Sequence, residues 1–306
     1  MSAESHRISR LEPYLDRSEP APTLLKMLLG VQLAGFREDA HLSQDQAARE
    51  LGFSAAKLSR IESGNGRRPP AEQDVRALLR LYGTGDHESS VLLKLVRRAS
   101  EPGWWQRYDK RLMPEWFDRL VGLQEAAAAI RTFEIQYVPG LLQTPAYTRA
   151  VVERGLPTAS AGEVQRRVEL RTRRAQLLLR EDPPQLWAVL DESVLLRVLG
   201  SREVMREQLA RLVDMAERPN VTLQIVPLDV TNASAPNIPI TYLRFGGLDL
   251  PDVVYLEHIR SANFLEDRDE TEEYRIALDR LADEALTPQE SLALLRKTMK
   301  DRYAGP

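Results

Sequence analysis

The chain has 306 residues, 43% of them hydrophobic, with a formal net charge of −3 and no cysteine. This length and composition fit two domains with hydrophobic cores, and the lack of cysteine excludes disulfides and thiolate metal sites. No apolar run approaches the roughly 20 residues that span a bilayer, and the first residues lack the apolar segment of a signal peptide. We therefore expect a cytoplasmic protein with no membrane partner.

Residues 1–22 contain prolines among mixed charges and predict a flexible N-terminal arm. Further along, residues 42–68 predict two short helices, a tight turn and a basic loop. Ser43 and Gln46 have the spacing of a capping box at the start of the first helix. Gly52 is placed to end that helix in the left-handed conformation that glycine tolerates.

The second of these helices begins after Ser54, which is a suitable N-cap, and turns Leu58 and Ile61 inward. Because so few residues separate the two helices, they must cross steeply. This order predicts a helix-turn-helix whose second helix is shaped to enter the DNA major groove. A solvated helical hairpin is the alternative, but it does not explain why caps, turn, inward pair and basic loop coincide.

The outward face of the second helix and the loop after it are basic. From Ser54 to Arg68 there are four basic residues and one acidic residue, a local charge of +3. The overall charge of −3 does not argue against DNA binding, because the local patch is the relevant quantity. From their outward position we expect DNA contacts from Ala55, Ala56, Lys57, Ser59 and Arg60, and the loop after the helix adds the guanidiniums of Arg67 and Arg68.

The segment from about Thr23 to Tyr82 resembles a lambda-repressor-like (Xre-type) five-helix DNA-binding domain. The matching residues are Leu42-Ser43-Gln44, Ala47-Ala48, Leu51-Gly52 and Ser54–Gly64. The resemblance implies that Gln44 touches a phosphate or a base edge, and that Arg37 and Glu62 form a buried structural pair. It places Ala55, Ala56 and Arg60 against bases, with Lys57 beside them, and Ser54, Asn65, Arg67 and Arg68 against phosphates.

Two of the base-facing positions are alanines, which offer a base edge only apolar contact. Arg60 could make a bidentate contact to guanine worth about 1–3 kcal/mol of discrimination. We therefore expect sparse direct readout that relies on Arg60 and Lys57, with phosphate contacts and DNA deformability contributing the rest.

A helix from Pro69-Pro70 to Gly83 completes the predicted DNA-binding domain, residues 23–83. A helical connector, residues 84–102, follows, and Glu101-Pro102-Gly103 breaks its helix. Residues 103–306 predict an α+β domain in which helices surround a small sheet, so the whole chain is mostly helical. The helices expected there are Pro114–Ile130, Glu163–Arg180, Glu192–Leu199, Ser201–Ala216, Thr271–Ala285 and Pro288–Lys300, and the strands are Arg131–Val138, Leu186–Leu190, Val221–Val226, Tyr242–Phe245 and Val253–His258.

This second region is similar to an actinobacterial family of antitoxin-like transcriptional regulators, in which a helix-turn-helix precedes a C-terminal domain of unknown function. The similarity rests on Trp104-Trp105 with Tyr108, Glu134–Thr144 (EIQYVPGLLQT), Arg171 with Arg174-Ala175-Gln176, Leu190-Asp191-Glu192 and Tyr255-Leu256-Glu257. It implies control of development or specialised metabolism, alongside a small partner protein encoded nearby. The chain departs from the family at Thr231–Ser234, where relatives often carry Gly and His.

No motif of an enzyme is present. The sequence lacks a phosphate-binding Gly-rich loop, a serine nucleophile elbow and an H-E-x-x-H motif. The four histidines are scattered, and Asp191-Glu192 at a strand–helix junction is typical of a cap. We expect no catalytic residue, no metal site and no cofactor.

Aromatic residues gather just after the connector, and two interpretations remain open for them. They form a core that anchors the second domain, which we favour, or part of them forms a pocket or docking surface for a ligand or partner. The arginine-rich helix of residues 166–180 is typical of an amphipathic helix with a charged outer face rather than a DNA contact. The candidate ligand or partner residues are Trp104, Trp105, Tyr108 and Trp116.

The sequence as a whole predicts a sequence-specific transcriptional regulator that binds double-stranded DNA through residues 54–63. We expect a homodimer, because one recognition helix buries little DNA surface and two-fold pairing sets half-sites about 34 Å apart. Its C-terminal domain would sense a ligand or a small protein partner. The alternative is an antitoxin-type protein that neutralises a small partner and binds DNA for autoregulation.

Overall fold

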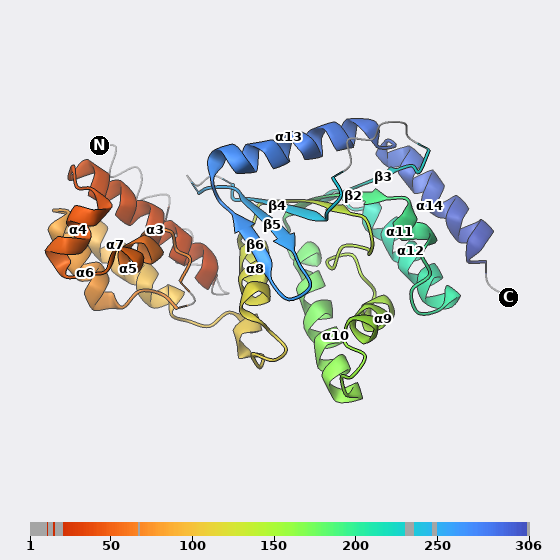
Figure 1. Ribbon diagram of the computed structural model, residues 1–306, viewed down its shortest axis with the longest axis horizontal. Coiled ribbons are helices and arrows are strands. Elements are labelled where there is room, and N and C mark those ends of the chain that lie inside the picture. Colours follow the sequence, from red (N-terminus) through yellow and green to blue (C-terminus); the bar gives the residue numbers. More distant parts are fainter. Residues whose placement is uncertain are drawn as a thin grey trace. The chain divides into compact units, whose positions relative to one another are not determined.

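The computed structural model describes residues 11, 15, 21–66, 68–229, 236–246 and 250–304. The chain divides into two compact units, Met1–Ala126 with Gly247–Leu250, and Ala127–Gly246 with Pro251–Pro306 (Figure 1). Most of the predicted arm 1–22, Arg67 and the loop Thr231–Ser234 lie outside the described residues. None of the helices in the described part of the chain is long and apolar enough to cross a bilayer.

The first unit is helical and is built around α3. Leu25, Leu29 and Leu33 of α3 are almost completely buried, and α3 contacts α5, α7 and α8. Gly30 permits the closest approach, because a Cβ atom there would lie 2.3 Å from the backbone oxygen of Glu62. In the described part of this unit the helices are α3 (Pro22–Asp39), α4 (Gln44–Leu51), α5 (Ala55–Glu62), α6 (Glu72–Leu81), α7 (Asp86–Ala99), the 3-10 turn η1 (Trp104–Arg107) and α8 (Glu115–Ala126).

The second unit contains a six-stranded mixed sheet with the order β3-β2-β1-β4-β5-β6. β1, β2 and β3 run parallel, whereas β4, β5 and β6 pair antiparallel. The strands are β1 (Ala129–Glu134), β2 (Gln185–Asp191), β3 (Val221–Val226), β4 (Ile240–Arg244), β5 (Val253–Glu257) and β6 (Ala262–Leu265). The helices are α9 (Pro145–Gly155), α10 (Ala161–Ala175), the 3-10 turn η2 (Gln176–Leu179), α11 (Ser193–Leu196), α12 (Arg202–Ala216), α13 (Arg268–Glu284) and α14 (Pro288–Arg302).

Different helices pack against the two faces of the sheet. On one face Phe133, Val189 and Val254 pack with Leu278 and Leu281 of α13, which lies along the sheet in Figure 1. α9, α10 and α12 lie on the other side of the sheet in the same view. The predicted α+β class, mostly helical and with a small sheet among helices, is confirmed.

Several predicted boundaries differ from the structure. The helix expected to reach Ile130 ends at Ala126, because Ala128 pairs in the sheet with Arg244 and Gln185. Pairing in the ladder therefore outweighs the helix propensity of the alanine run. α9 and β6 were not predicted, although Thr144 caps α9 and Pro145 occupies its first turn.

The predicted domain boundary near residue 102 falls inside the first compact unit. Gly122 of α8 lies against Thr23 of α3 and against the ring of Trp105, closely enough that a Cβ atom would be 2.0 Å from the Thr23 hydroxyl. η1 and α8 therefore pack as part of the helical unit.

Candidate nucleic-acid interface

The turn between α4 and α5 is built from local hydrogen bonds. The Ser43 hydroxyl accepts the N–H of Gln46 at 3.2 Å, and the Gln46 side chain accepts the N–H of Ser43 at 2.8 Å. Gly52 ends α4 with φ 65°, in the left-handed region. The N–H of Lys57 bonds the hydroxyl of Ser54 at 3.1 Å and starts α5. Residues 43–62 thus form the predicted helix-turn-helix.

α5 has one buried side and one exposed side. Leu58 and Ile61 are buried in the core of the first unit. The opposite side of α5 carries small residues and one long cation, namely Ala55, Ala56, Ser59 and Arg60, all of them exposed. The only large polar group that this side offers a base edge is therefore the guanidinium of Arg60.

The carboxylate of Glu62 fixes the inner end of α5. It accepts the Nε of Arg37 at 2.9 Å, the side-chain amide of Gln44 at 3.0 Å and the hydroxyl of Tyr82 at 3.3 Å. Glu62 is 7% exposed, and its hydrogen bond raises the pKa of Arg37. The three donors come from α3, α4 and the end of α6, so this one carboxylate holds α5 to three other elements.

The polar residues expected to touch DNA differ in their intramolecular bonds. Within the described part of the chain, the side chains of Arg60 and Arg68 are exposed and make no hydrogen bond or ion pair. Lys57 has its Nζ 2.8 Å from Asp74 Oδ1 and 3.7 Å above the ring of Phe53. Gln44 already bonds Glu62. These contacts leave the two arginines as the cations best placed to receive a phosphate or a base.

The loop after α5 is fastened to the helices behind it. Gly64 is buried with φ 66°, and a Cβ atom there would lie 2.6 Å from the Cα of Met27. Lys26 of α3 donates to the carbonyl of Gly66 at 2.6 Å, and burial lowers the pKa of Lys26. Asn65 accepts a hydrogen bond from Arg119 of α8 at 2.7 Å. These tertiary contacts hold the loop in place, and no pattern in the sequence predicts them.

The aromatic residues after the connector divide between core and surface. Trp105 and Phe117 are buried, whereas Trp104, Tyr108 and Trp116 are half-buried. The indole N–H of Trp104 donates to Glu125 at 2.8 Å, and its ring meets Tyr108 edge-on with centroids 6.2 Å apart. The two buried rings are part of the hydrophobic core. A ligand or partner could contact only the three half-buried rings, so the docking hypothesis is restricted to them.

The motif of residues 134–144 forms a fixed loop after β1 in the second unit. Gln143 donates to the carbonyl of Val138 at 2.7 Å, and the N–H of Val138 donates to the hydroxyl of Tyr147 at 3.3 Å. Gln208 of α12 is fully buried and accepts the N–H of Thr144 at 2.8 Å. These hydrogen bonds join the loop to α9 and α12, so its residues have a structural role.

A charged cluster on the sheet was missed at the level of sequence. Glu134 of β1 and Glu257 of β5 share a face of the sheet with Tyr255, whose hydroxyl donates to Glu257 at 2.9 Å. Arg174 of α10 is buried, and a Cβ atom on Gly140 would lie 2.1 Å from its Nη2. The predicted charged outer face of this helix is therefore wrong for Arg174, which points inward because a glycine leaves it room.

Ionisation within this cluster is perturbed. Burial raises the pKa of Glu134 to about 8, with a further rise from Glu257. Burial also lowers the pKa of Arg174 to about 10, as does the charge of Arg171. The pairing of strand glutamates with arginines three residues apart on a helix is a signal that could have indicated these contacts.

The residues considered for catalysis have structural partners. Asp191 accepts the N–H of Ser193 at 2.9 Å, and Glu192 accepts the N–H of Leu228 at 3.0 Å. Among the described residues no group of three or more histidines, aspartates or glutamates could hold a metal ion.

Two family models match the chain. One, described as a helix-turn-helix domain, covers residues 28–92, and the other, described as a domain of unknown function (DUF5753), covers residues 117–297. No curated protein and no solved structure matches significantly. The first match agrees with the geometry of α4 and α5 and indicates a DNA-binding regulator. The second covers more than half of the chain, and the chain therefore belongs to the family defined by this domain of unknown function, DUF5753.

Proposed function

We propose that this protein is a sequence-specific transcriptional regulator that acts in the cytoplasm as a homodimer, with an Xre-type helix-turn-helix. The observation that carries the proposal is the exposed side of α5. It ends in Arg60, whose guanidinium makes no intramolecular ion pair among the described residues, while Glu62 holds the helix from behind. A rigid helix that presents a free guanidinium is suited to read a guanine in the major groove.

Phosphate contacts would come mainly from the residues around α5. Arg68 is exposed and makes no ion pair within the described part of the chain, and Ser54 begins the recognition helix. Asn65 accepts the bond from Arg119 through its Oδ1 atom, so its side chain would reach a phosphate through its amide N–H groups. Arg67 is proposed from the sequence alone. A second copy of the helix, one turn of DNA away, would supply the remaining specificity.

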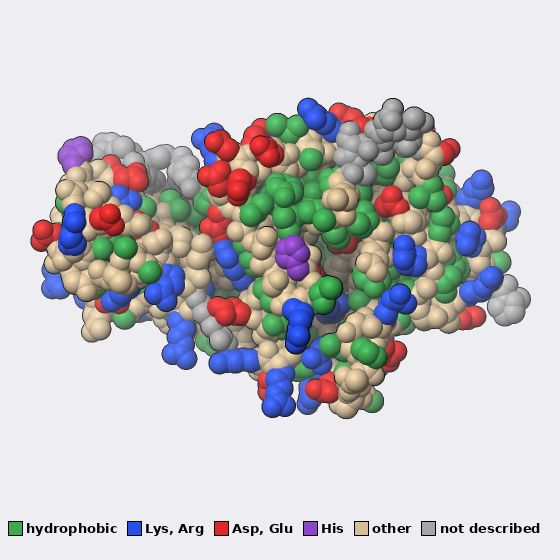
Figure 2. Space-filling model, in the orientation of Figure 1, with side chains coloured by type: hydrophobic (Ala, Val, Ile, Leu, Met, Phe, Trp, Pro, Cys, Tyr) green, Lys and Arg blue, Asp and Glu red, His purple; other side chains and the backbone are tan. Residues whose placement is uncertain are grey.

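The second unit would receive the signal. The described part of this unit exposes several large hydrophobic side chains, the most exposed being Ile259 at 100% and Leu228 at 58%. Figure 2 shows hydrophobic side chains gathered on the visible face of the second unit. Apolar surface of this kind favours a small protein partner or an apolar ligand.

An antitoxin-type protein remains the second candidate, and the same exposed apolar surface supports it. In that case the main activity is neutralisation of a small partner, and DNA binding serves autoregulation. Co-purification with the product of a neighbouring gene, followed by a growth assay with and without this chain, discriminates the two. Rescue of growth from that product would favour the antitoxin.

The central test is selection of DNA duplexes from a random pool by the full chain, followed by a base-substitution scan on the selected site. With wild-type protein we expect a two-fold symmetric site with few strongly discriminated positions. Arg60→Ala should flatten discrimination at one position of each half-site, whereas Lys94→Ala, an exposed lysine on α7, should leave the scan unchanged. If Arg60→Ala weakened every sequence equally, Arg60 would be a phosphate contact and its assignment to a base would be wrong.

A further inference from the structure

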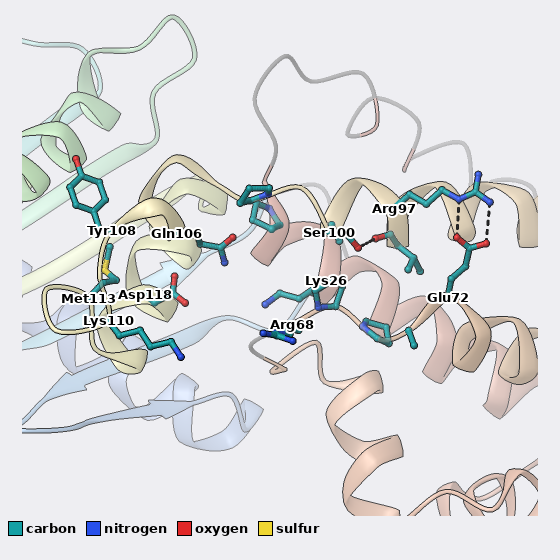
Figure 3. A pocket seen from close by; sticks show the side chains of 17 residues that line it. Lys26, Arg68, Glu72, Arg97, Ser100, Gln106, Tyr108, Lys110, Met113 and Asp118 are labelled. Carbon is teal, nitrogen blue, oxygen red and sulfur yellow. Dashed lines mark hydrogen bonds and ion pairs between the residues drawn. The ribbon is translucent and has the colours of Figure 1, made fainter.

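The first unit contains a cavity of about 520 Å³ beside the loop that follows α5 (Figure 3). Its walls are the N-terminal part of α3, residues 68–72, the end of α7 and the segment from Ser100 to Met113. This volume lies in the range of sites that hold small molecules, about 300–1,000 Å³.

Three cationic side chains point into this cavity from three different segments. Figure 3 shows the ends of Lys26, Arg68 and Lys110 turned toward the same space, with Gln106 and Asp118 beside them. A fourth cation in the wall, Arg97, is already paired, because its guanidinium donates to the carboxylate of Glu72 at 2.9 and 3.0 Å. The cavity therefore has a basic centre.

The three cations have hydrogen-bonding capacity left over. Lys26 is 8% exposed and its ammonium group donates to the carbonyl of Gly66, which leaves two further N–H groups. Arg68 and Lys110 make no ion pair or side-chain hydrogen bond within the described residues. Gln106 uses its oxygen to accept the N–H of Gly103, so its amide N–H groups remain as donors.

The charge inside the cavity is poorly balanced. Apart from the Arg97–Glu72 pair, the carboxylate of Asp118 is the one acidic side chain in the wall, against three cations. Burial lowers the pKa of Lys26 and the charge of Asp118 raises it only in part. An anion placed among the three cations would favour the charged form of Lys26 and offset the lowering of its pKa by burial.

We propose that this cavity binds a small phosphomonoester. A phosphate dianion offers several acceptor oxygens to N–H donors that converge from different directions, and the three cations with Gln106 form such a set. Tyr108 and Met113 line the same cavity and provide an apolar wall for the rest of the molecule. Asp118 would repel a second carboxylate but could accept a hydroxyl, which favours a phosphorylated polyol or sugar.

The site is connected to the DNA-facing surface through one loop. A second cavity, of about 460 Å³, is lined by Lys57 and Arg60 of α5 and shares Lys26, Arg68 and Pro70 with the first. A ligand that holds Arg68 in the first cavity removes one cation from the surface available to DNA phosphates. The bound ligand therefore weakens DNA binding, and this consequence rests on the proposed function.

Binding itself is tested without DNA, by isothermal titration calorimetry on the full chain with ribose 5-phosphate and with ribose. We expect ribose 5-phosphate to bind and ribose not to bind. Lys110→Ala removes a charge-assisted contact and should weaken ribose 5-phosphate binding about tenfold or more. Lys110 is chosen because a substitution of buried Lys26 would also disturb the loop.

The matched control is Lys94→Ala, which removes a lysine of the same unit that does not line the cavity and should leave the dissociation constant within twofold. No binding of ribose 5-phosphate, equal binding of ribose, or equal binding by wild type and Lys110→Ala would each overturn the proposal.

A second measurement separates a small ligand from the DNA backbone as the occupant. The affinity of the chain for the selected duplex is measured against salt concentration, with wild type and Lys110→Ala. We expect equal slopes and weaker duplex binding by wild type when ribose 5-phosphate is present. A slope that falls by about 0.9 in Lys110→Ala would mean that a DNA phosphate occupies the cavity, and the small-ligand site would be wrong. If the chain bound no duplex at all, the proposed function would fail, while the calorimetry would still decide on the cavity.

Discussion

The Nε atom of Arg37 lies 2.9 Å from the Oε1 atom of Glu62 and joins α3 to the last residue of α5. The side chains are 12% and 5% exposed, so the pair is largely removed from water. Tyr82 and Gln44 bond the same carboxylate. The position of the recognition helix therefore depends on one buried charge.

Glu62→Gln should lower the free energy of unfolding by about 3 kcal/mol, because removal of the buried carboxylate leaves Arg37 with the exposed carboxylate of Glu38 at 3.5 Å and the carbonyl of Leu42 as its partners. The measurement is urea denaturation followed by circular dichroism. Arg37→Met combined with Glu62→Met should recover part of the loss, since both charges are then absent. Glu72→Gln is the control, because both of its partners, Arg76 and Arg97, are exposed, and it should leave the midpoint nearly unchanged. A Glu62→Gln midpoint equal to that of wild type would contradict this role.

Gly30→Ala should displace α5 from α3. The new Cβ atom would lie 2.3 Å from the backbone oxygen of Glu62 and 2.9 Å from that of Ile61, and neither backbone atom can move alone. Overpacking of this kind costs typically about 1–3 kcal/mol, and the duplex affinity should fall together with the melting temperature.

Gly162→Ala provides the matched comparison for Gly30. Gly162 lies in α10 with no atom within 4 Å of an added Cβ, so alanine should stabilise the protein slightly through its higher helix propensity. Equal melting temperatures for the two variants would show that the close approach at Gly30 is not needed.

The parts of the interface that the sequence predicts are those that local chemistry decides. The Ser43–Gln46 capping box, the left-handed Gly52 and the inward Leu58 and Ile61 each depend on residues a few positions apart. Their order along the chain was enough to identify the helix-turn-helix. The α+β class followed in the same way from alternating and helical patterns.

Long-range contacts could not be predicted in this way. The ion pair of Lys57 with Asp74 and the bond of Asn65 to Arg119 join segments that no periodicity relates. The inward turn of Arg174 depends on the room that Gly140 leaves in another loop. Which cations remain available for DNA is decided by these tertiary partners, so the sequence alone could not rank them.

Asp74→Asn should strengthen DNA binding. The substitution breaks the 2.8 Å ion pair with Lys57 on the recognition helix, which frees one ammonium group and removes one negative charge beside it. We expect the affinity for a non-specific duplex to rise about threefold, with the salt slope steeper by about 0.9. Fluorescence anisotropy at several salt concentrations measures both. Asp301→Asn, which makes the same charge change on α14 of the second unit, should alter neither, and an equal effect of the two variants would assign the gain to net charge alone.

Glu134 should make the stability of the second unit depend on pH. Burial, with a smaller contribution from Glu257, raises its pKa from the ordinary value of 4.5 to about 8, against the opposing effects of Arg174 and Thr132. Between these two values the folded state holds a proton that the unfolded chain has lost. The stabilising contribution is therefore complete below about pH 4.5 and is lost as the pH rises through about 8.

From pH 6 to pH 8 the free energy of unfolding should fall by about 2 kcal/mol from this one group, at roughly 1.4 kcal/mol per pH unit over most of the range. Glu134→Gln keeps the shape of the protonated side chain and cannot ionise, so its stability should be flat over the same range and should exceed that of wild type at pH 8. Denaturation curves at intervals of half a pH unit measure this, with Glu153→Gln on the exposed side of α9 as the control. Parallel pH profiles for wild type and Glu134→Gln would mean that Glu134 is already ionised in the folded protein, held by the nearby arginines.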